Sequence, residues 1–222
     1  MSKFIFLSHE LDESTPGFGG AQCFTKESAS RISDGKSSNS EHWIFSNHCG
    51  THIDLPRHFD NNGLNLSDYS DPEDWIFENV KIIELSISND YLIKVSDIAN
   101  HLSTDCDLLI LKTSFESKRD SKEYWNNNPG ISSEVGFHLR SNYPNIKAIG
   151  FDFISLTAFQ HREEGRVAHR AFLSPYMDMK PIRIIEDMKL SQLVDAPAEV
   201  IVSPLQVKNA DGTQVTIIAK LL

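Results

Sequence analysis

The sequence predicts a single-domain α/β protein with a mixed β-sheet core and flanking helices. Apolar runs of strand length recur along the whole chain, and turn-forming residues separate them. Two of these runs, at 108–111 and 148–151, contain only apolar residues and glycine, which is typical of strands buried on both faces. Only two or three segments carry helix-start signals, so strands dominate the prediction.

The first half of the chain is expected to begin with a strand at 4–7, followed by a loop rich in proline and glycine. Strand-like runs at 22–30 and 41–47 flank a polar segment of turn residues at 33–40, which predicts a hairpin with a long loop. The second strand of this hairpin leads directly into a histidine-rich stretch, which therefore lies at a strand end. A further strand is expected at 80–88.

The second half is expected to alternate strands and helices. Ser96 is a candidate N-cap for a short helix ending at Leu102, and Ser132 for a helix with Glu134 in its first turn. The charged segment before His169 is expected to be a loop. The remaining strands are expected at 108–111, 148–155, 182–185, 200–202 and 215–221. An Asp-Gly turn predicts that the last two form a hairpin.

The composition limits partners and location. A formal net charge of −10 argues against a general nucleic-acid surface, because phosphate binding requires a concentrated basic face. The four consecutive apolar residues near the N-terminus are fewer than the about 7–15 of a signal peptide or the about 20 of a membrane helix. Cys23, Cys49 and Cys106 are widely spaced, which favours reduced thiols over a disulfide framework. We therefore expect a cytoplasmic protein without nucleic-acid or membrane partners.

Residues 48–58, His-Cys-Gly-Thr-His-Ile-Asp-Leu-Pro-Arg-His, are the most informative stretch of the chain. Three of the nine histidines fall in this window of eleven residues, together with an aspartate. Imidazole and carboxylate groups are ligands of Zn²⁺, Mn²⁺ and other transition metals. A surface histidine cluster is the alternative, but such a cluster does not require Gly50 and Pro56 where the chain must bend.

The spacing fits a metal site only if the chain bends. On a straight strand His48 and His52 would lie about 13 Å apart, too far to share one ion. A bend at the glycine between them brings them together, and His52 and Asp54 then lie on one face of the following extended segment. A turn at Pro56 returns His58 towards the same place. The stretch therefore predicts a metal-dependent hydrolase, in which the ion activates water and polarises a carbonyl group.

This stretch resembles the H-x-G-T-H-x-D-x-P-x-H motif of the cyclase-like metal hydrolases, which include bacterial kynurenine formamidases and isatin hydrolases. It matches every fixed position. Further segments resemble elements of the family in the same order, over nearly the whole chain, at 7–11, 150–155, 168–170, 184–186 and 204–221. The resemblance implies one swivelling β/β/α-type domain over residues 1–222. It also implies a homo-oligomer, either a dimer or a tetramer.

The resemblance implies a role for each matching residue. A first Zn²⁺, with Mn²⁺ as the alternative, would be held by His48, His52 and Asp54. A second ion, bridged by Asp54, would be held by His169 and Glu186, which would line the pocket in members that bind one ion. His58, titrating near neutral pH, would be the general acid/base and could also touch the metal. No serine or cysteine nucleophile is required, and Cys49 is expected to pack beside the ligands.

The substrate implied by the resemblance is a small amide or ester. N-formyl-L-kynurenine, the arylformamidase substrate of tryptophan catabolism, is the leading prediction. The alternatives are a cyclic amide such as isatin, a cyclase or dehydratase reaction with the same metal, and a non-catalytic metal-binding protein. Three departures from the family concern specificity. Phe18 stands in the N-terminal loop where formamidases tend to carry tryptophan, and is expected to form an aromatic pocket wall. The frequent Glu-Gly-Leu is Glu186-Asp187-Met188 here, and the loop at 116–129 is distinct.

Overall fold

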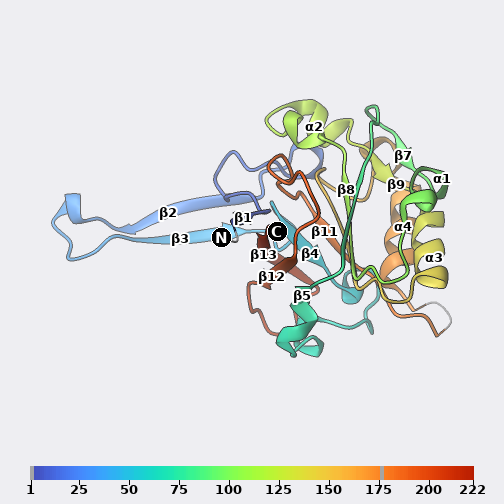
Figure 1. Cartoon of the computed structure of the whole chain (residues 1–222). Coiled ribbons are helices and arrows are strands. Elements are labelled where there is room, and N and C mark those ends of the chain that lie inside the picture. Colours follow the sequence, from blue (N-terminus) through green and yellow to red (C-terminus); the bar gives the residue numbers. More distant parts are fainter. Residues whose placement is uncertain (1–2, 176–177) are drawn as a thin grey trace.

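A mixed β-sheet forms the centre of this computed structural model, which describes residues 3–175 and 178–222 (Figure 1). Nine strands pair into this sheet among the described residues. Eight of them follow one another in the order β5 (Ile76–Phe77), β12 (Glu199–Pro204), β13 (Gly212–Lys220), β4 (His52–Asp54), β11 (Arg183–Glu186), β10 (Ala148–Phe151), β8 (Leu108–Lys112) and β6 (Val80–Glu84). The ninth, β1 (Phe4–Phe6), pairs with β13.

The sheet changes from parallel to antiparallel pairing at β4. Strands β6, β8, β10 and β11 run parallel to one another, whereas β4 pairs antiparallel with both β11 and β13. The sheet curls until it is nearly closed into a barrel. The predicted α/β class with a mixed sheet is therefore confirmed. Part of the 48–58 stretch lies on β4, at the junction of the two halves of the sheet.

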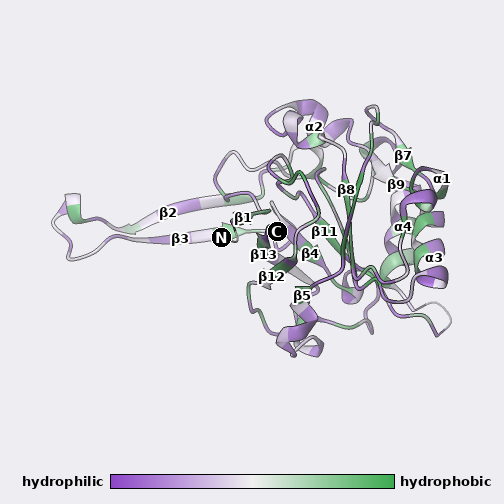
Figure 2. Ribbon diagram, viewed as in Figure 1, coloured by the Kyte–Doolittle hydropathy of each residue, from purple (hydrophilic) through white to green (hydrophobic). Residues whose placement is uncertain are grey.

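Apolar side chains are buried on both faces of the central strands. Leu108 and Ile110 of β8 pack into one cluster with residues of β4, β12 and β13. Leu109 and Leu111 pack on the opposite face, against the helices. This alternation follows from the two-residue period of a strand, and it explains why the run at 108–111 is apolar throughout. Figure 2 shows hydrophobic residues along β8 in the interior of the molecule.

The described ranges contain four α-helices. These are α1 (Val95–Ile98), α2 (Lys122–Asn126), α3 (Ser133–Asn142) and α4 (Arg162–Leu173). Helix α3 follows Ser132 as predicted, and α3 and α4 pack side by side on the outer face of the sheet (Figure 1). Helix α1 begins before Ser96, because the carboxylate of Asp97 accepts a hydrogen bond from the Lys94 amide at 2.8 Å. Strands β7 (Leu92–Ile93) and β9 (Gly130–Ile131) form a separate parallel pair. None of the helices in these ranges is long and apolar enough to cross a membrane.

Helix α4 stands where a charged loop was expected. Its buried residues recur at intervals of one, two and three, on one side of the helix: Gly165, Ala168, His169, Ala171, Phe172 and Leu173. The loop prediction was wrong because charged residues dominate the segment, and small residues form much of its buried side. As a result, His169 is carried on a helix that packs against the sheet.

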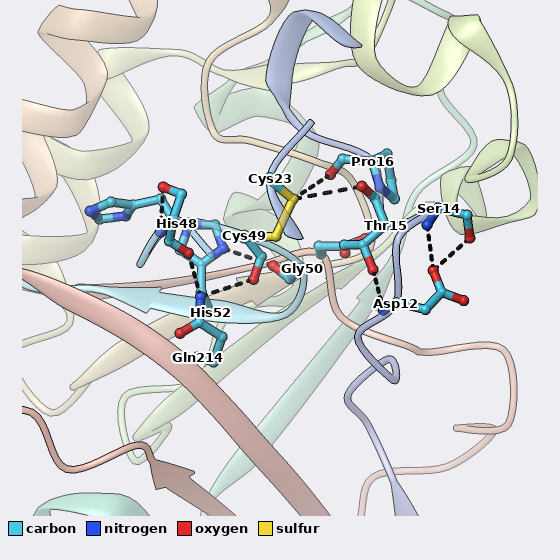
Figure 3. The surroundings of a disulfide bond; sticks show 12 residues. Asp12, Ser14, Thr15, Pro16, Cys23, His48, Cys49, Gly50, His52 and Gln214 are labelled. Atoms are coloured by element: carbon cyan, nitrogen blue, oxygen red, sulfur yellow. Dashed lines mark hydrogen bonds between the residues drawn. A yellow bond between two sulfur atoms is a disulfide. The ribbon is translucent and has the colours of Figure 1, made fainter. Parts of the chain in front are cut away.

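Strands β2 (Phe24–Ser30) and β3 (Ser40–Phe45) form the predicted antiparallel hairpin, which projects from the body as an arm (Figure 1). Figure 2 shows mostly hydrophilic and neutral residues along this β2–β3 arm. At its base Cys23 and Cys49 form a disulfide, with their Cα atoms 5.6 Å apart (Figure 3). The expectation of reduced thiols was wrong for this pair, because the hairpin brings together two cysteines 26 residues apart. Cys106 is the free cysteine of the described residues.

Candidate metal centre

One cavity of about 360 Å³ collects the histidines and carboxylates that the sequence pointed to. They come from the loop after β3, from β4, from the 3₁₀ turn Pro56–His58, from α4 and from β11. The cavity is lined by, among others, His48, His52, Asp54, His58, His169 and Glu186. Glu186 and His52 are register partners on the antiparallel strands β11 and β4, so strand pairing places them side by side.

The 48–58 stretch bends at Gly50, where the backbone φ is 63°. The left-handed φ favours glycine, and a Cβ atom at this position would lie 2.5 Å from Cδ2 of Leu11, so another residue would also have to displace the Leu11 side chain. The bend leaves the rings of His48 and His52 with centroids 5.2 Å apart (Figure 3). Nδ1 of His52 donates to the Gly50 carbonyl at 2.8 Å, which leaves Nε2 to face the carboxylates.

His169 is oriented by the same kind of contact. Its Nδ1 donates to the carbonyl of Gly165, one helical turn earlier, at 2.8 Å. Its Nε2 therefore lies 3.6 Å from an oxygen of Asp54 and 3.6 Å from an oxygen of Glu186. Phe59 stacks on the imidazole, with ring centroids 4.5 Å apart. A backbone carbonyl that fixes one ring nitrogen is the usual support of a metal-binding histidine.

Asp54 lies at the centre of the cluster. Its Oδ1 is 2.7 Å from Nδ1 of His48, which is a hydrogen-bond distance, and 3.3 Å from Nε2 of His52. The same Nε2 is 3.5 Å from Glu186. Two ligands of one tetrahedral Zn²⁺, each bonded at about 2.0–2.1 Å, are separated by about 3.4 Å. The separations between His52 and the two carboxylates match this value, so the donor set fits a divalent metal ion.

Two groups of donor atoms, each within 4.8 Å of one another, could hold an ion: His52, Asp54 and Glu186, and His48, Asp54 and His58. Asp54 belongs to both groups. Glu186 is fixed from behind, since its Oε1 accepts hydrogen bonds from the Leu156 amide at 2.7 Å and from the Ser155 hydroxyl at 3.2 Å. These contacts restrict the carboxylate to one orientation, as outer partners of metal ligands do.

The buried carboxylates change the pKa values of the histidines. Burial lowers the pKa of His52, but hydrogen bonding to Asp54 and the charge of Glu186 outweigh burial and raise it to about 9. The same opposing effects raise the pKa of His169 to about 10. Burial acts to raise the pKa of Asp54, yet hydrogen bonds from the surrounding histidines hold it well below its usual range. The cluster thus binds protons tightly, and a divalent ion could take the place of these protons.

Asp211 is a site residue that the sequence analysis did not identify. Its Oδ2 lies 3.2 Å from Nε2 of His48 and 3.2 Å from Nδ1 of His58. Its Oδ1 accepts a hydrogen bond from the side-chain Nδ2 of Asn47 at 2.7 Å. In the sequence Asp211 was only part of an Asp-Gly turn signal. The next residue, Gly212, packs closely on the histidine, because a Cβ atom there would lie 2.5 Å from Cε1 of His48.

Asp187, which directly follows Glu186, is a second residue that was not foreseen. Its buried carboxylate accepts hydrogen bonds from Arg119, at 3.0 Å from Nε and 2.7 Å from Nη2, and from the hydroxyl of Tyr124. Its carbonyl accepts a hydrogen bond from Thr51 Oγ1 at 2.6 Å. Asp187 therefore links the histidine-rich stretch, the β11 carboxylate and the segment at 113–129, which includes α2.

The outer wall of the cavity is aromatic and basic. Phe18 lines the cavity, and its ring centroid lies 5.4 Å from that of Phe159. Arg162 and Arg166 of α4 line the same cavity. Neither arginine was singled out from the sequence, because their segment was expected to be a loop.

Comparisons with known proteins show which sequences and folds this chain resembles. A family model described as "Putative cyclase" matches residues 5–158. The kynurenine formamidase of Bacillus mycoides is 28% identical over 219 residues, which cover 96% of this chain and 95% of that protein. The kynurenine formamidase of Bacillus thuringiensis subsp. konkukian is 27% identical, with 99% and 98% covered. Isatin hydrolase A from Ralstonia solanacearum has a similar structure, with a TM-score of 0.81 at 19% identity, covering 100% of this chain and 92% of that one. A predicted metal-dependent hydrolase from Bacillus stearothermophilus has a TM-score of 0.77 at 18% identity, with 99% and 98% covered.

Proposed function

Because the chain belongs to the cyclase family, whose model matches more than half of its length, we propose that it is a metal-dependent hydrolase that cleaves a small amide C–N bond with water. The observation that carries this proposal is the buried carboxylate of Asp54, which contacts three imidazoles in one cavity. A buried carboxylate requires compensating positive charge. A divalent ion bound here supplies that charge, together with the Lewis acidity that activates water and polarises a carbonyl group.

The proposed ligand roles follow the family resemblance. A first ion, Zn²⁺ or alternatively Mn²⁺, would be bound by His48, His52 and Asp54. A second ion would use Asp54 as a bridge, together with His169 and Glu186. The hydrogen bonds that fix Nδ1 of His52 and of His169 support this proposal, because they leave Nε2 of both rings available. The 3.3 Å separation of His52 from Asp54 supports the first set, and the 3.6 Å separations of His169 from Asp54 and from Glu186 support the second.

His58 is the proposed general acid/base. Burial lowers its pKa, so the imidazole is neutral at pH 7. Hydrogen bonds from the two histidines lower the pKa of Asp211, although burial opposes them, so its carboxylate is ionised and can only accept. Nδ1 of His58 therefore donates to Asp211, which leaves the lone pair of Nε2 free. In this tautomer Nε2 can accept a proton from the attacking water and return it to the leaving nitrogen.

N-formyl-L-kynurenine is the proposed substrate. The two kynurenine formamidases support it, since each aligns over nearly the whole chain. A cyclic amide of the isatin type is the second candidate, supported by the structural similarity to isatin hydrolase A. A cyclase or dehydratase reaction with the same metal is the third. It differs from hydrolysis in a measurable way, because only hydrolysis transfers ¹⁸O from labelled water into the released acid.

Metal content and turnover together test the proposal. Protein produced with Zn²⁺ and Mn²⁺ in the medium is analysed by mass spectrometry, and we expect bound metal. The metal-loaded protein is then assayed with N-formyl-L-kynurenine, isatin and formanilide. Protein that binds neither metal would contradict the whole proposal. Bound metal without turnover of any of the three compounds would contradict the substrate assignment alone.

Three histidine variants separate binding from catalysis. His52→Ala is expected to lose the metal. His58→Ala is expected to keep most of the metal and to lose turnover. His101→Ala is the matched control, because His101 is exposed and lies outside the cavity. A non-catalytic metal-binding protein would instead show no turnover in any of these proteins.

We also propose that the chain forms a homo-oligomer. The β2–β3 arm supports this, because Trp43 and Ile44 on it are 64% and 61% exposed. A second cavity of about 720 Å³, with Phe6 and Trp43 in its walls, lies at the base of the arm. Sedimentation velocity tests the assembly, and a monomer would contradict it. The cytoplasmic location stays a prediction, and the disulfide removes the cysteine argument for it, since disulfides are typical of oxidising compartments.

A further inference from the structure

One face of helix α4 carries a proposed metal ligand and two arginines. Arg162, Arg166 and His169 are spaced by four and three residues, so they lie on the same side of the helix. All three line the 360 Å³ cavity. At a rise of about 1.5 Å per residue, Arg166 and Arg162 lie about 5 and about 10 Å from His169 along the helix axis. The helix thus holds two guanidinium groups at the cavity wall, beyond the cluster of carboxylates.

Arg162 is held by aromatic rings and not by a carboxylate. Its Cζ lies 4.1 Å from the ring centroid of Phe159 and 5.9 Å from that of Phe18. Among the residues that the structure describes, none forms an ion pair with it. A guanidinium group over an aromatic ring keeps the N–H donors at its edge available. The two phenylalanines therefore orient Arg162 without using its hydrogen-bonding capacity.

Arg166 has a partner that a ligand can replace. It pairs with Glu163 three residues earlier on the helix, and the two side chains are 49% and 92% exposed. An ion pair in contact with water contributes little stability. A carboxylate entering the cavity could therefore displace Glu163 at small cost.

We propose that Arg162 and Arg166 form a carboxylate-binding subsite. The substrate is then a small amide that carries a carboxylate group about 5–10 Å from its scissile bond. This inference rests on the proposed hydrolase function and specifies its substrate class. The chain has a net charge of −10, and Asp54 and Glu186 line the inner part of the cavity, so an anionic substrate requires local cations. Arginine binds carboxylates through two parallel N–H···O bonds, and the ring of Phe18 is placed to contact the apolar part of such a substrate.

A matched pair of substrates tests the subsite. 3-Formamidobenzoate and its methyl ester have the same scissile bond, but only the first is anionic. We expect the metal-loaded protein to prefer the acid in kcat/KM. Arg162→Gln is expected to lower the acid-to-ester ratio about tenfold, mainly through the KM of the acid. Arg162→Lys should restore part of the preference for the acid, because lysine keeps the positive charge but cannot form the bidentate pair of hydrogen bonds.

A charge control and a binding measurement complete the test. Lys147→Gln removes the same charge from an exposed position just before β10, outside the cavity, and should leave the ratio unchanged. Calorimetry with metal-free protein should show that Arg162→Gln weakens binding of 3-formamidobenzoate about tenfold. Such binding without any hydrolysis would support the subsite and contradict the hydrolase. Hydrolysis with an equal acid-to-ester ratio in the parent protein and in Arg162→Gln would support the hydrolase and overturn the subsite.

Discussion

The ion pair of Asp187 provides the sharpest test of how the site is supported. The Asp187 side chain is 2% exposed and that of Arg119 is 14% exposed. The carboxylate also accepts a hydrogen bond from Tyr124, which is fully buried. Replacing Asp187 with alanine would leave a largely buried guanidinium group and a buried hydroxyl group without their partner. Removal of one partner from a buried ion pair costs about 3–5 kcal/mol.

The backbone of Asp187 adds a second, separable effect. Its φ is 54°, a left-handed conformation in which alanine is about 1 kcal/mol less favourable than glycine or aspartate. We therefore expect Asp187→Ala to lower the free energy of unfolding by about 4–6 kcal/mol and Asp187→Gly by about 3–5 kcal/mol. Asn209→Ala is the matched control for the backbone effect. Asn209 has a φ of 59° and is exposed, so we expect a loss of about 1 kcal/mol.

Urea unfolding of the metal-free proteins, followed by circular dichroism, measures these differences. Adding Arg119→Met to Asp187→Gly should recover part of the loss, because the unpaired guanidinium group is then gone. Chelator competition should also show weaker metal binding in Asp187→Ala, because loss of the side-chain contacts to Arg119 and Tyr124 frees the backbone next to Glu186 to shift. If Asp187→Ala destabilises the protein by no more than Asn209→Ala does, the ion pair does not support the site and the reasoning fails.

Three further predictions concern protons and thiols. The pKa values of His52 and His169 are raised to about 9 and about 10, so metal binding at pH 7 should release protons and should become stronger as the pH rises. Calorimetric titrations with metal, repeated at several pH values and in buffers of different ionisation enthalpy, measure both effects. Titrations that show neither effect would contradict the prediction. Burial raises the pKa of Asp152 to about 6 from 3.8, so its contribution to stability is present below pH 3.8 and is lost as the pH rises through 6. The stability of Asp152→Asn relative to the parent protein should therefore rise by about 2 kcal/mol between pH 4 and pH 7, and a constant difference in urea unfolding would contradict this. Unfolded, unreduced protein should react with one equivalent of a thiol reagent, through Cys106, and three equivalents would contradict the disulfide.

Much of the sheet and the inner part of the site could be predicted from local patterns. The apolar run at 108–111 indicated a strand buried on both faces, and β8 is such a strand. The glycine and proline of the 48–58 stretch indicated bends, and the chain turns at Gly50 and again at the 3₁₀ turn Pro56–His58. The strand and the bends are each determined by a few neighbouring residues, so they can be predicted from one sequence alone.

The missed features depend on contacts between distant parts of the chain. Asp211 meets His48 and His58 only because β13 pairs with β4, and nothing near Asp211 in the sequence indicates that pairing. The disulfide of Cys23 depends in the same way on the β2–β3 hairpin. Helix α4 was missed although its polar and apolar residues separate onto two sides at helical spacing, because charged residues dominate the segment and three of its six buried residues are glycine or alanine.

The same contacts suggest how chemistry and specificity are divided in this fold. The residues proposed to hold metal lie largely on β4, β11 and α4, where strand register and helix packing fix them. Asp187 adopts the backbone conformation that glycine adopts without strain, and its carboxylate is held by Arg119 and by Tyr124 of α2. Among the described residues, Phe18 and Arg162 share no hydrogen bond or ion pair with these supports, but the turn Phe18–Gly20 packs against α2, the helix that carries Tyr124, so a change in this cavity wall would reach the inner cluster through that helix.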